Sequence, residues 1–265
     1  MPVDYHMHTP LCKHATGMPR EYVEQALARG LPEIGFSDHN PMPDGFDPTV
    51  RMSRDDFPEY LRMIRAVQRR YSNLITIRFG IEADFHPGTE EYVREFLASA
   101  PFDYVIGSVH YLEDWPFDNP EYVEEYLKRD IDEIYRNYYA LIERMAHSKL
   151  YDIAGHLDVV KKFGHRPKSD MTDAVRRALG AIRDAGMCYE VNTSGLRKPC
   201  KEIYPEAKIV TLAARLGVPV TLGSDSHEPK TVGQDYDRAI AMLREAGYRE
   251  VWRFEGRRRF PVPLP

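Results

Sequence analysis

Short apolar stretches alternate with amphipathic helical patterns along this chain, and this alternation limits the possible folds more than any other feature. Seven of the stretches have the length and apolar character of strands, at residues 4–8, 34–37, 75–81, 103–109, 152–155, 187–191 and 218–222. Helical patterns follow them at residues 19–29, 55–71, 90–99, 121–147, 173–185, 209–216 and 237–246. Strands that alternate with helices predict right-handed crossovers and a parallel sheet.

Polar residues stand at the same end of successive predicted strands, which favours a closed barrel over an open sheet. The length of 265 residues suits one α/β barrel, which typically needs about 250. We therefore expect an α/β fold, a seven-stranded TIM-like barrel that forms a single domain over residues 1–265. In such barrels the functional site lies at the carboxyl ends of the strands. A further strand-like run follows at residues 251–254.

Histidines recur at these strand ends. His6 and His8 are two residues apart, so on a strand their side chains share one face and can share a metal ion. For an isolated motif of this kind, a pair of surface histidines is an equally good interpretation. The rest of the chain favours a metal site, because seven of its ten histidines lie at or near predicted strand ends. These seven are His6, His8, His14, His39, His110, His156 and His227.

Two carboxylates extend this pattern. Glu82 ends an apolar strand, where it would be poorly solvated without a cation, and its two oxygens can bridge two ions. Asp225 and His227 repeat the spacing of two residues. These side chains exceed what one ion needs, so we expect two to three divalent transition-metal ions, with zinc, manganese and iron all suitable. A structural zinc site is the alternative, but such sites are usually closed and rich in cysteine.

Composition excludes several classes of protein. The formal net charge of −5 argues against a broad basic face that grips nucleic acid. The sequence has neither an apolar run of membrane-spanning length nor a signal-peptide pattern, so we expect no membrane partner. Three cysteines without metal-type pairing fit free thiols in the cytoplasm. Cys12, among the histidines, is an alternative soft ligand.

Six segments, in the same order along the chain, resemble the motifs of the polymerase-and-histidinol-phosphatase (PHP) family. They are residues 4–9, 36–43, 80–85, 106–110, 155–158 and 223–227. The resemblance implies a distorted seven-stranded (β/α)7 barrel and a trinuclear metal centre. It distributes the candidate ligands over three ions: His6, His8, Glu82 and Asp225 for the first, Glu82, His110 and His156 for the second, and His14, His39 and His227 for the third.

Within the family, the chain is most similar to the enzymes that hydrolyse L-histidinol phosphate to L-histidinol and phosphate in histidine biosynthesis. The resemblance thus implies a small-molecule phosphate monoester as substrate. The ions would offset the charge of the phosphoryl oxygens and lower the pKa of a bridging water, and the resulting hydroxide would attack phosphorus. Glu82 and Asp225 would act in catalysis through the ions that they hold.

Other side chains are candidates for supporting roles. Arg197, after the sixth strand, and Lys161, after His156, could bind phosphate, and either could instead be a solvated surface charge. Lys162 and Arg166 are neighbours that could substitute. Asp38 could protonate the leaving oxygen or orient a ligand histidine.

The long loop at residues 40–52 follows a strand that bears a candidate ligand. Its Asp44 and Asp47 could select the substrate by charge, since histidinol phosphate carries an ammonium and an imidazole, or could be ordinary turn residues beside proline and glycine.

Three alternative functions remain open at this point. Another PHP-type phosphoesterase would use the same cluster on nucleotides or oligonucleotides. An amidohydrolase-like metal hydrolase would also carry His-x-His on its first strand and Asp on its last. A non-enzymatic metal-binding or regulatory protein is the third alternative.

Overall fold

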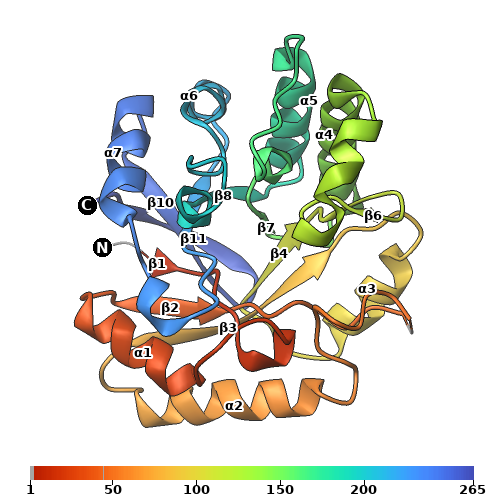
Figure 1. Cartoon of the computed structure of the whole chain (residues 1–265). Coiled ribbons are helices and arrows are strands. Elements are labelled where there is room, and N and C mark those ends of the chain that lie inside the picture. The colour runs from red at the N-terminus through yellow and green to blue at the C-terminus, as the bar shows by residue number, and fades with distance from the viewer. Residues whose placement is uncertain (1–2, 44) are drawn as a thin grey trace.

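Seven parallel strands form a barrel that is surrounded by helices in the computed structural model, which describes residues 3–43 and 45–265 (Figure 1). In sheet order, the strands are β1 (Val3–Asp4), β2 (Glu33–Phe36), β3 (Thr76–Asp84), β4 (Tyr104–Ser108), β7 (Ile153–Ala154), β8 (Cys188–Asn192) and β9 (Val220–Gly223). Each neighbouring pair is parallel. The seven strands correspond to the seven predicted stretches, although β1 is shorter than expected.

The first and last strands meet and bring the two edges of the sheet together. The backbone N–H of Tyr5 donates to the carbonyl of Leu222 at 3.3 Å. Further along, the N–H of Ser226 donates to the carbonyl of His6 at 3.0 Å, and the N–H of His8 donates to the carbonyl of Ser226 at 2.9 Å. These bonds set the segment that carries the first two histidines directly beside the segment that carries Asp225.

Helices form a ring around the strands (Figure 1). They are α1 (Pro19–Ala28), α2 (Phe57–Arg70), α3 (Glu90–Ala98), α4 (Ile131–Ser148), α5 (Thr172–Asp184), α6 (Ala207–Arg215) and α7 (Tyr236–Ala246). The expectation of one helix over residues 121–147 is wrong. Residues Pro120–Lys128 form a separate 3₁₀ segment, and α4 starts after Asp130, whose side chain accepts hydrogen bonds from the N–H groups of Asp132 and Glu133. Such N-caps satisfy the first free donors of a helix and fix where it begins.

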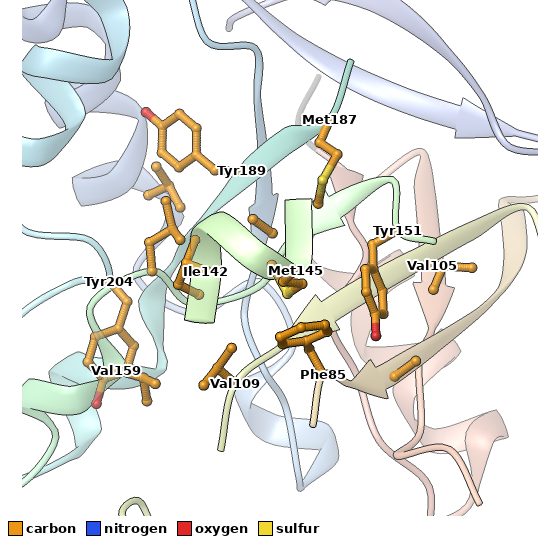
Figure 2. Close-up of a cluster of buried hydrophobic side chains, with 14 of the residues drawn as sticks. Phe85, Val105, Val109, Ile142, Met145, Tyr151, Val159, Met187, Tyr189 and Tyr204 are labelled. Atoms are coloured by element: carbon orange, nitrogen blue, oxygen red, sulfur yellow. The ribbon is translucent and has the colours of Figure 1, made fainter. Parts of the chain in front are cut away.

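An apolar layer lies between the strands and the helices. Figure 2 shows part of this layer, which includes Met145 of α4, Phe85 and Tyr151. Within the described part of the chain, no helix combines the length and the apolar character that crossing a bilayer requires.

The amino-terminal half of the barrel interior is packed with apolar side chains. Tyr104 is fully buried there, and its hydroxyl donates to the carbonyl of Tyr5 at 2.7 Å. A β-carbon at Gly80 would lie 2.2 Å from the Tyr104 ring, so glycine is needed to admit that ring. The antiparallel pair β10 (Glu250–Glu255) and β11 (Arg258–Pro263) extends this packing, because Phe254 joins the same cluster.

The strand-like run expected at residues 251–254 is β10, and its partner β11 was not expected. A second small hairpin, β5 (Tyr111–Leu112) with β6 (Trp115–Pro116), was also not expected. Since apolar packing occupies the amino-terminal half of the barrel, polar chemistry is left to the carboxyl ends of the strands.

Candidate metal centre

The seven predicted histidines and two predicted carboxylates come together at the carboxyl ends of the strands, from segments far apart in the chain. Their nitrogen and oxygen atoms form overlapping groups of three whose members lie within 4.8 Å of one another. Most of them also line one cavity of about 220 Å³. Convergence of this kind is the expected consequence of parallel strands that each end in a polar residue.

The first group consists of His6 Nε2, His8 Nε2, Glu82 Oε2 and Asp225 Oδ1. Glu82 Oε2 lies 3.2 Å from the His6 nitrogen and 3.5 Å from the His8 nitrogen. Asp225 Oδ1 lies 3.6 and 3.4 Å from the same two nitrogens. Ligand atoms bound tetrahedrally to one zinc ion at its usual bond lengths are about 3.3 Å apart. The four histidine–carboxylate distances therefore match those expected around one tetrahedral metal ion.

Several of these atoms are buried and have no hydrogen-bond partner among the described residues. They include His6 Nε2, His8 Nε2 and Glu82 Oε2. Buried polar atoms are normally paired, and leaving three of them unpaired at one point is costly. A cation between them would satisfy all three, so the donor set fits a metal ion.

The second group uses the other oxygen of Glu82. Glu82 Oε1 lies 3.0 Å from His156 Nε2 and 3.6 Å from His110 Nε2, and these two nitrogens are 3.1 Å apart. Burial opposes ionisation of Glu82, but His6, His39 and His156 together outweigh it and hold the pKa of this carboxyl well below its usual range. An ionised glutamate with one oxygen in each group has the geometry to bridge two ions.

The third group is formed by His14, His39 and His227. The Nε2 atoms of His14 and His227 are 2.9 Å apart. The Nδ1 of His14 donates to the carbonyl of Cys12 at 2.7 Å, and the Nδ1 of His227 donates to that of Asp225 at 3.1 Å. Each histidine thus carries its proton on Nδ1, which leaves the Nε2 lone pair for a ligand. Cys12 also lies within 4.8 Å of ligand atoms from His8 and His227, so the alternative of a thiol ligand stays open.

Two buried carboxylates, which were not predicted from the sequence, accept hydrogen bonds from the Nδ1 atoms of two ligand histidines. Glu190 in β8 accepts from His6 Nδ1 at 2.9 Å, and Asp84 at the end of β3 accepts from His110 Nδ1 at 2.5 Å. Burial lowers the pKa of His110, but Asp84 outweighs it and raises that pKa to about 9. The argument applied to Glu82, a carboxylate inside an apolar stretch, would have singled out Glu190 as well.

Asp38, a candidate from the sequence, is a third carboxylate close to a ligand histidine. It is fully buried and accepts hydrogen bonds from both the backbone N–H and the hydroxyl of Thr9. Its Oδ1 lies 3.6 Å from His8 Nδ1. Since the side chain is held behind His8, this placement favours the orienting role over proton donation to a leaving group.

The expectation that Lys161 binds phosphate is not supported. Its ammonium is fully buried, 2.9 Å from Asp158 Oδ2, and donates to the carbonyl of Ile203 at 2.8 Å. The next residue, Lys162, lines the cavity instead, together with Lys198, which sequence reasoning missed.

Arg197 is tied to the loop of the metal ligands rather than to the cavity wall. Its guanidinium donates to the carbonyl of Ser224 at 2.6 Å, directly before Asp225. Asp225 has a φ of 50°, a left-handed conformation that is strained for a residue other than glycine, and such strain gathers at functional sites. Arg197 therefore helps to hold a strained ligand loop.

A parallel barrel with histidines and carboxylates gathered at its carboxyl ends has the architecture of the metal-dependent barrel hydrolases. The PHP domain model matches residues 4–194, and the chain belongs to the PHP family. The family resemblance found in the motifs is therefore confirmed. The matched region ends before Asp225 and His227, so the first group and the third group each take one side chain from the rest of the chain.

Full-length relatives extend the similarity. A probable histidinol-phosphatase of Deinococcus radiodurans is 48% identical over 248 residues, which cover 94% of this chain and 95% of the relative. The histidinol-phosphatase of Bacillus subtilis is 32% identical over 88% of this chain and 96% of its own. The crystal structure of histidinol phosphate phosphatase from Lactococcus lactis, complexed with zinc, L-histidinol and phosphate, has a TM-score of 0.84. Its sequence identity is 29%, and the match covers 98% of both chains.

Proposed function

We propose that this chain is a metal-dependent phosphomonoesterase that hydrolyses L-histidinol phosphate to L-histidinol and phosphate in histidine biosynthesis. The observation that carries the proposal is the cavity of about 220 Å³, which combines seven of the nine candidate metal ligands with Lys162 and Lys198. A phosphate dianion needs positive charge from several directions, and this lining supplies it. The relatives from Deinococcus radiodurans, Bacillus subtilis and Lactococcus lactis support this choice of substrate over another PHP-type phosphoesterase substrate.

We propose two to three divalent ions of zinc, manganese or iron per chain, held by the three groups described above. When bound, such ions supply Lewis acidity that offsets phosphate charge and acidifies water. Glu82 has one oxygen in each of the first two groups and would hold them at a fixed separation. The hydroxyl of Ser194 donates to Asp225 Oδ2 at 3.0 Å, which leaves Oδ1 turned toward His6 and His8.

The two lysines of the cavity would bind the phosphoryl oxygens that face away from the ligand groups. The ammonium of Lys198 lines the cavity and has no hydrogen-bond partner among the described residues. Burial lowers the pKa of Lys198, and repulsion by Lys162 adds to this effect. The ammonium is poorly solvated and unpaired, so a bound phosphate would stabilise its charged form. This would strengthen phosphate binding.

The organisation of the chain follows from the same comparisons. A single barrel domain over residues 1–265 is part of this proposal, and it is supported by the match over 98% of both chains. Cys12, Cys188 and Cys200 are free thiols, in line with the expected cytoplasmic location, which stays a prediction.

Catalytic efficiency on competing substrates tests the proposed function. We expect kcat/KM for L-histidinol phosphate to exceed those for an aryl phosphate and for adenosine monophosphate by at least about 100-fold, or roughly 2.7 kcal/mol of discrimination. The assay should contain added manganese or zinc. Equal efficiencies would assign the chain to another phosphoesterase activity of the family, and no phosphate release from any of the three would reject phosphatase function.

A further inference from the structure

One carboxylate in the cavity belongs to none of the three ligand groups. Asp118 lies in the loop between β6 and the 3₁₀ segment Pro120–Lys128, and it lines the cavity beside Lys162 and Lys198. The other acidic side chains of this lining, Glu82 and Asp225, are occupied by the ligand histidines. Asp118 is thus the negative charge that the proposed centre leaves for the substrate.

Lys162 fixes the position of this carboxylate. Its ammonium donates to the backbone carbonyl of Asp118 at 2.6 Å and to Oδ2 at 3.1 Å. Within the described residues, Oδ1 of Asp118 has no hydrogen-bond partner, and the side chain is 24% exposed. A carboxylate of the cavity lining that is held by one oxygen, while the other oxygen is unpaired, is preorganised to accept a hydrogen bond from a ligand.

Asp118 is also kept charged. Burial opposes its ionisation, but Lys162, His110 and His156 together outweigh burial and hold the pKa of the Asp118 carboxyl below its ordinary value. An ionised carboxylate cannot donate a proton to a leaving oxygen, whereas it binds an ammonium group well.

The chemistry of the proposed substrate requires such a group close to the phosphate. In a 2-aminoalkyl phosphate, only two carbon atoms separate the ammonium nitrogen from the ester oxygen. The carboxylate that recognises this ammonium must therefore line the same cavity as the phosphate. Asp47, expected from the sequence to select it, is engaged by the Tyr111 hydroxyl and is not part of this lining, and Asp44 lies outside the described residues.

We propose that Asp118 is the specificity-determining residue that binds the ammonium group of a 2-aminoalkyl phosphate and so favours aminated over non-aminated phosphate monoesters. The inference rests on the proposed function, and it names the residue that would let the enzyme discriminate among phosphate monoesters. Loss of a charge-assisted hydrogen bond in such a site lowers efficiency by roughly 10- to 100-fold.

Two substrates that differ only in the amine test the proposal: L-histidinol phosphate and its deamino analogue, 3-(imidazol-4-yl)propyl phosphate. The wild-type protein should prefer the aminated substrate by roughly 10- to 100-fold in kcat/KM. The Asp118→Asn variant should lose that preference while its efficiency on the analogue stays within about threefold of wild type. The matched control is Asp114→Asn, which removes an exposed carboxylate from the neighbouring β5–β6 turn and should leave both efficiencies unchanged.

Each contrary result has a distinct meaning. A wild-type protein that hydrolyses both substrates equally overturns the role of Asp118, whether or not the variant folds. An Asp118→Asn variant that keeps the preference, or that loses both activities equally with normal metal content and melting temperature, also overturns it. Absence of phosphate release from either substrate by the wild-type protein instead rejects the proposed function itself.

Discussion

His6 Nδ1 lies 2.9 and 3.0 Å from the two carboxylate oxygens of Glu190, so this buried carboxylate fixes both the orientation and the proton of the imidazole. With the proton on Nδ1, the Nε2 lone pair points toward Glu82 and Asp225. A β-carbon at Gly223 would lie 2.3 Å from Glu190 Oε2, which explains the glycine at this position. Gly223, close to Asp225, thus makes room for Glu190, and Glu190 in turn orients the ligand His6.

Replacing Glu190 by Gln should weaken metal binding by roughly 10- to 100-fold, because the amide supports the imidazole less strongly than the carboxylate does. Competition with a chelator of known affinity measures the change, and excess metal should restore activity. Glu245→Gln, an exposed change on α7, is the control. Unaltered metal affinity in Glu190→Gln would show that the contact does not tune the site.

Replacing Glu82 by Gln should reduce phosphatase activity by at least about 100-fold, since the variant loses the charge that two ligand groups share. The residue contributes little to the apolar core, so the circular dichroism spectrum and cooperative melting should persist. Turnover near that of the wild type would mean that Glu82 is not a ligand.

Lys161 and Lys162 should respond in opposite ways to replacement by Met. Lys161→Met removes the partner of buried Asp158 and should cost about 3 kcal/mol of unfolding free energy. Lys162→Met should cost less stability, because its partner Asp118 is 24% exposed and can be solvated. It should lower kcat/KM by roughly tenfold or more, because its ammonium lines the cavity. Denaturant unfolding and steady-state kinetics on both variants measure the difference. The reverse pattern would restore Lys161 as the phosphate-binding lysine.

Gly80→Ala should destabilise the barrel by about 1–3 kcal/mol, because the added methyl group meets the Tyr104 ring. Gly180→Ala is the matched control within α5, where nothing lies near the added carbon, and it should stabilise by about 0.5–1 kcal/mol. Melting temperatures that shift in the same direction for both variants would contradict the packing described for Tyr104.

Much of the fold and most of the candidate ligands could be predicted, because both depend on local patterns. A parallel barrel brings every strand end to one rim, so residues such as His6, Glu82 and Asp225 could be placed there without knowing any contact. Their division among three ions came from the family resemblance. The helix boundary at Asp130 was missed because the apolar spacing continues across residues 121–147, and the capping interaction outweighs it.

The remaining site residues depend on contacts that the spacing of residues does not encode. A short 3₁₀ turn at Val159–Lys161 decides which lysine faces the cavity. It places Lys161 in the protein interior and the next residue, Lys162, at the cavity. Asp118 and Lys198 come from loops, and loop paths are set by tertiary packing rather than by periodicity.

Metal dependence of L-histidinol phosphate hydrolysis tests the central claim most directly. The protein is stripped with a chelator, manganese or zinc is added back in measured equivalents, and phosphate release is followed beside elemental analysis of the same samples. We predict no activity without metal and full activity only at two to three bound ions per chain. Full activity with one bound ion or none would contradict the account.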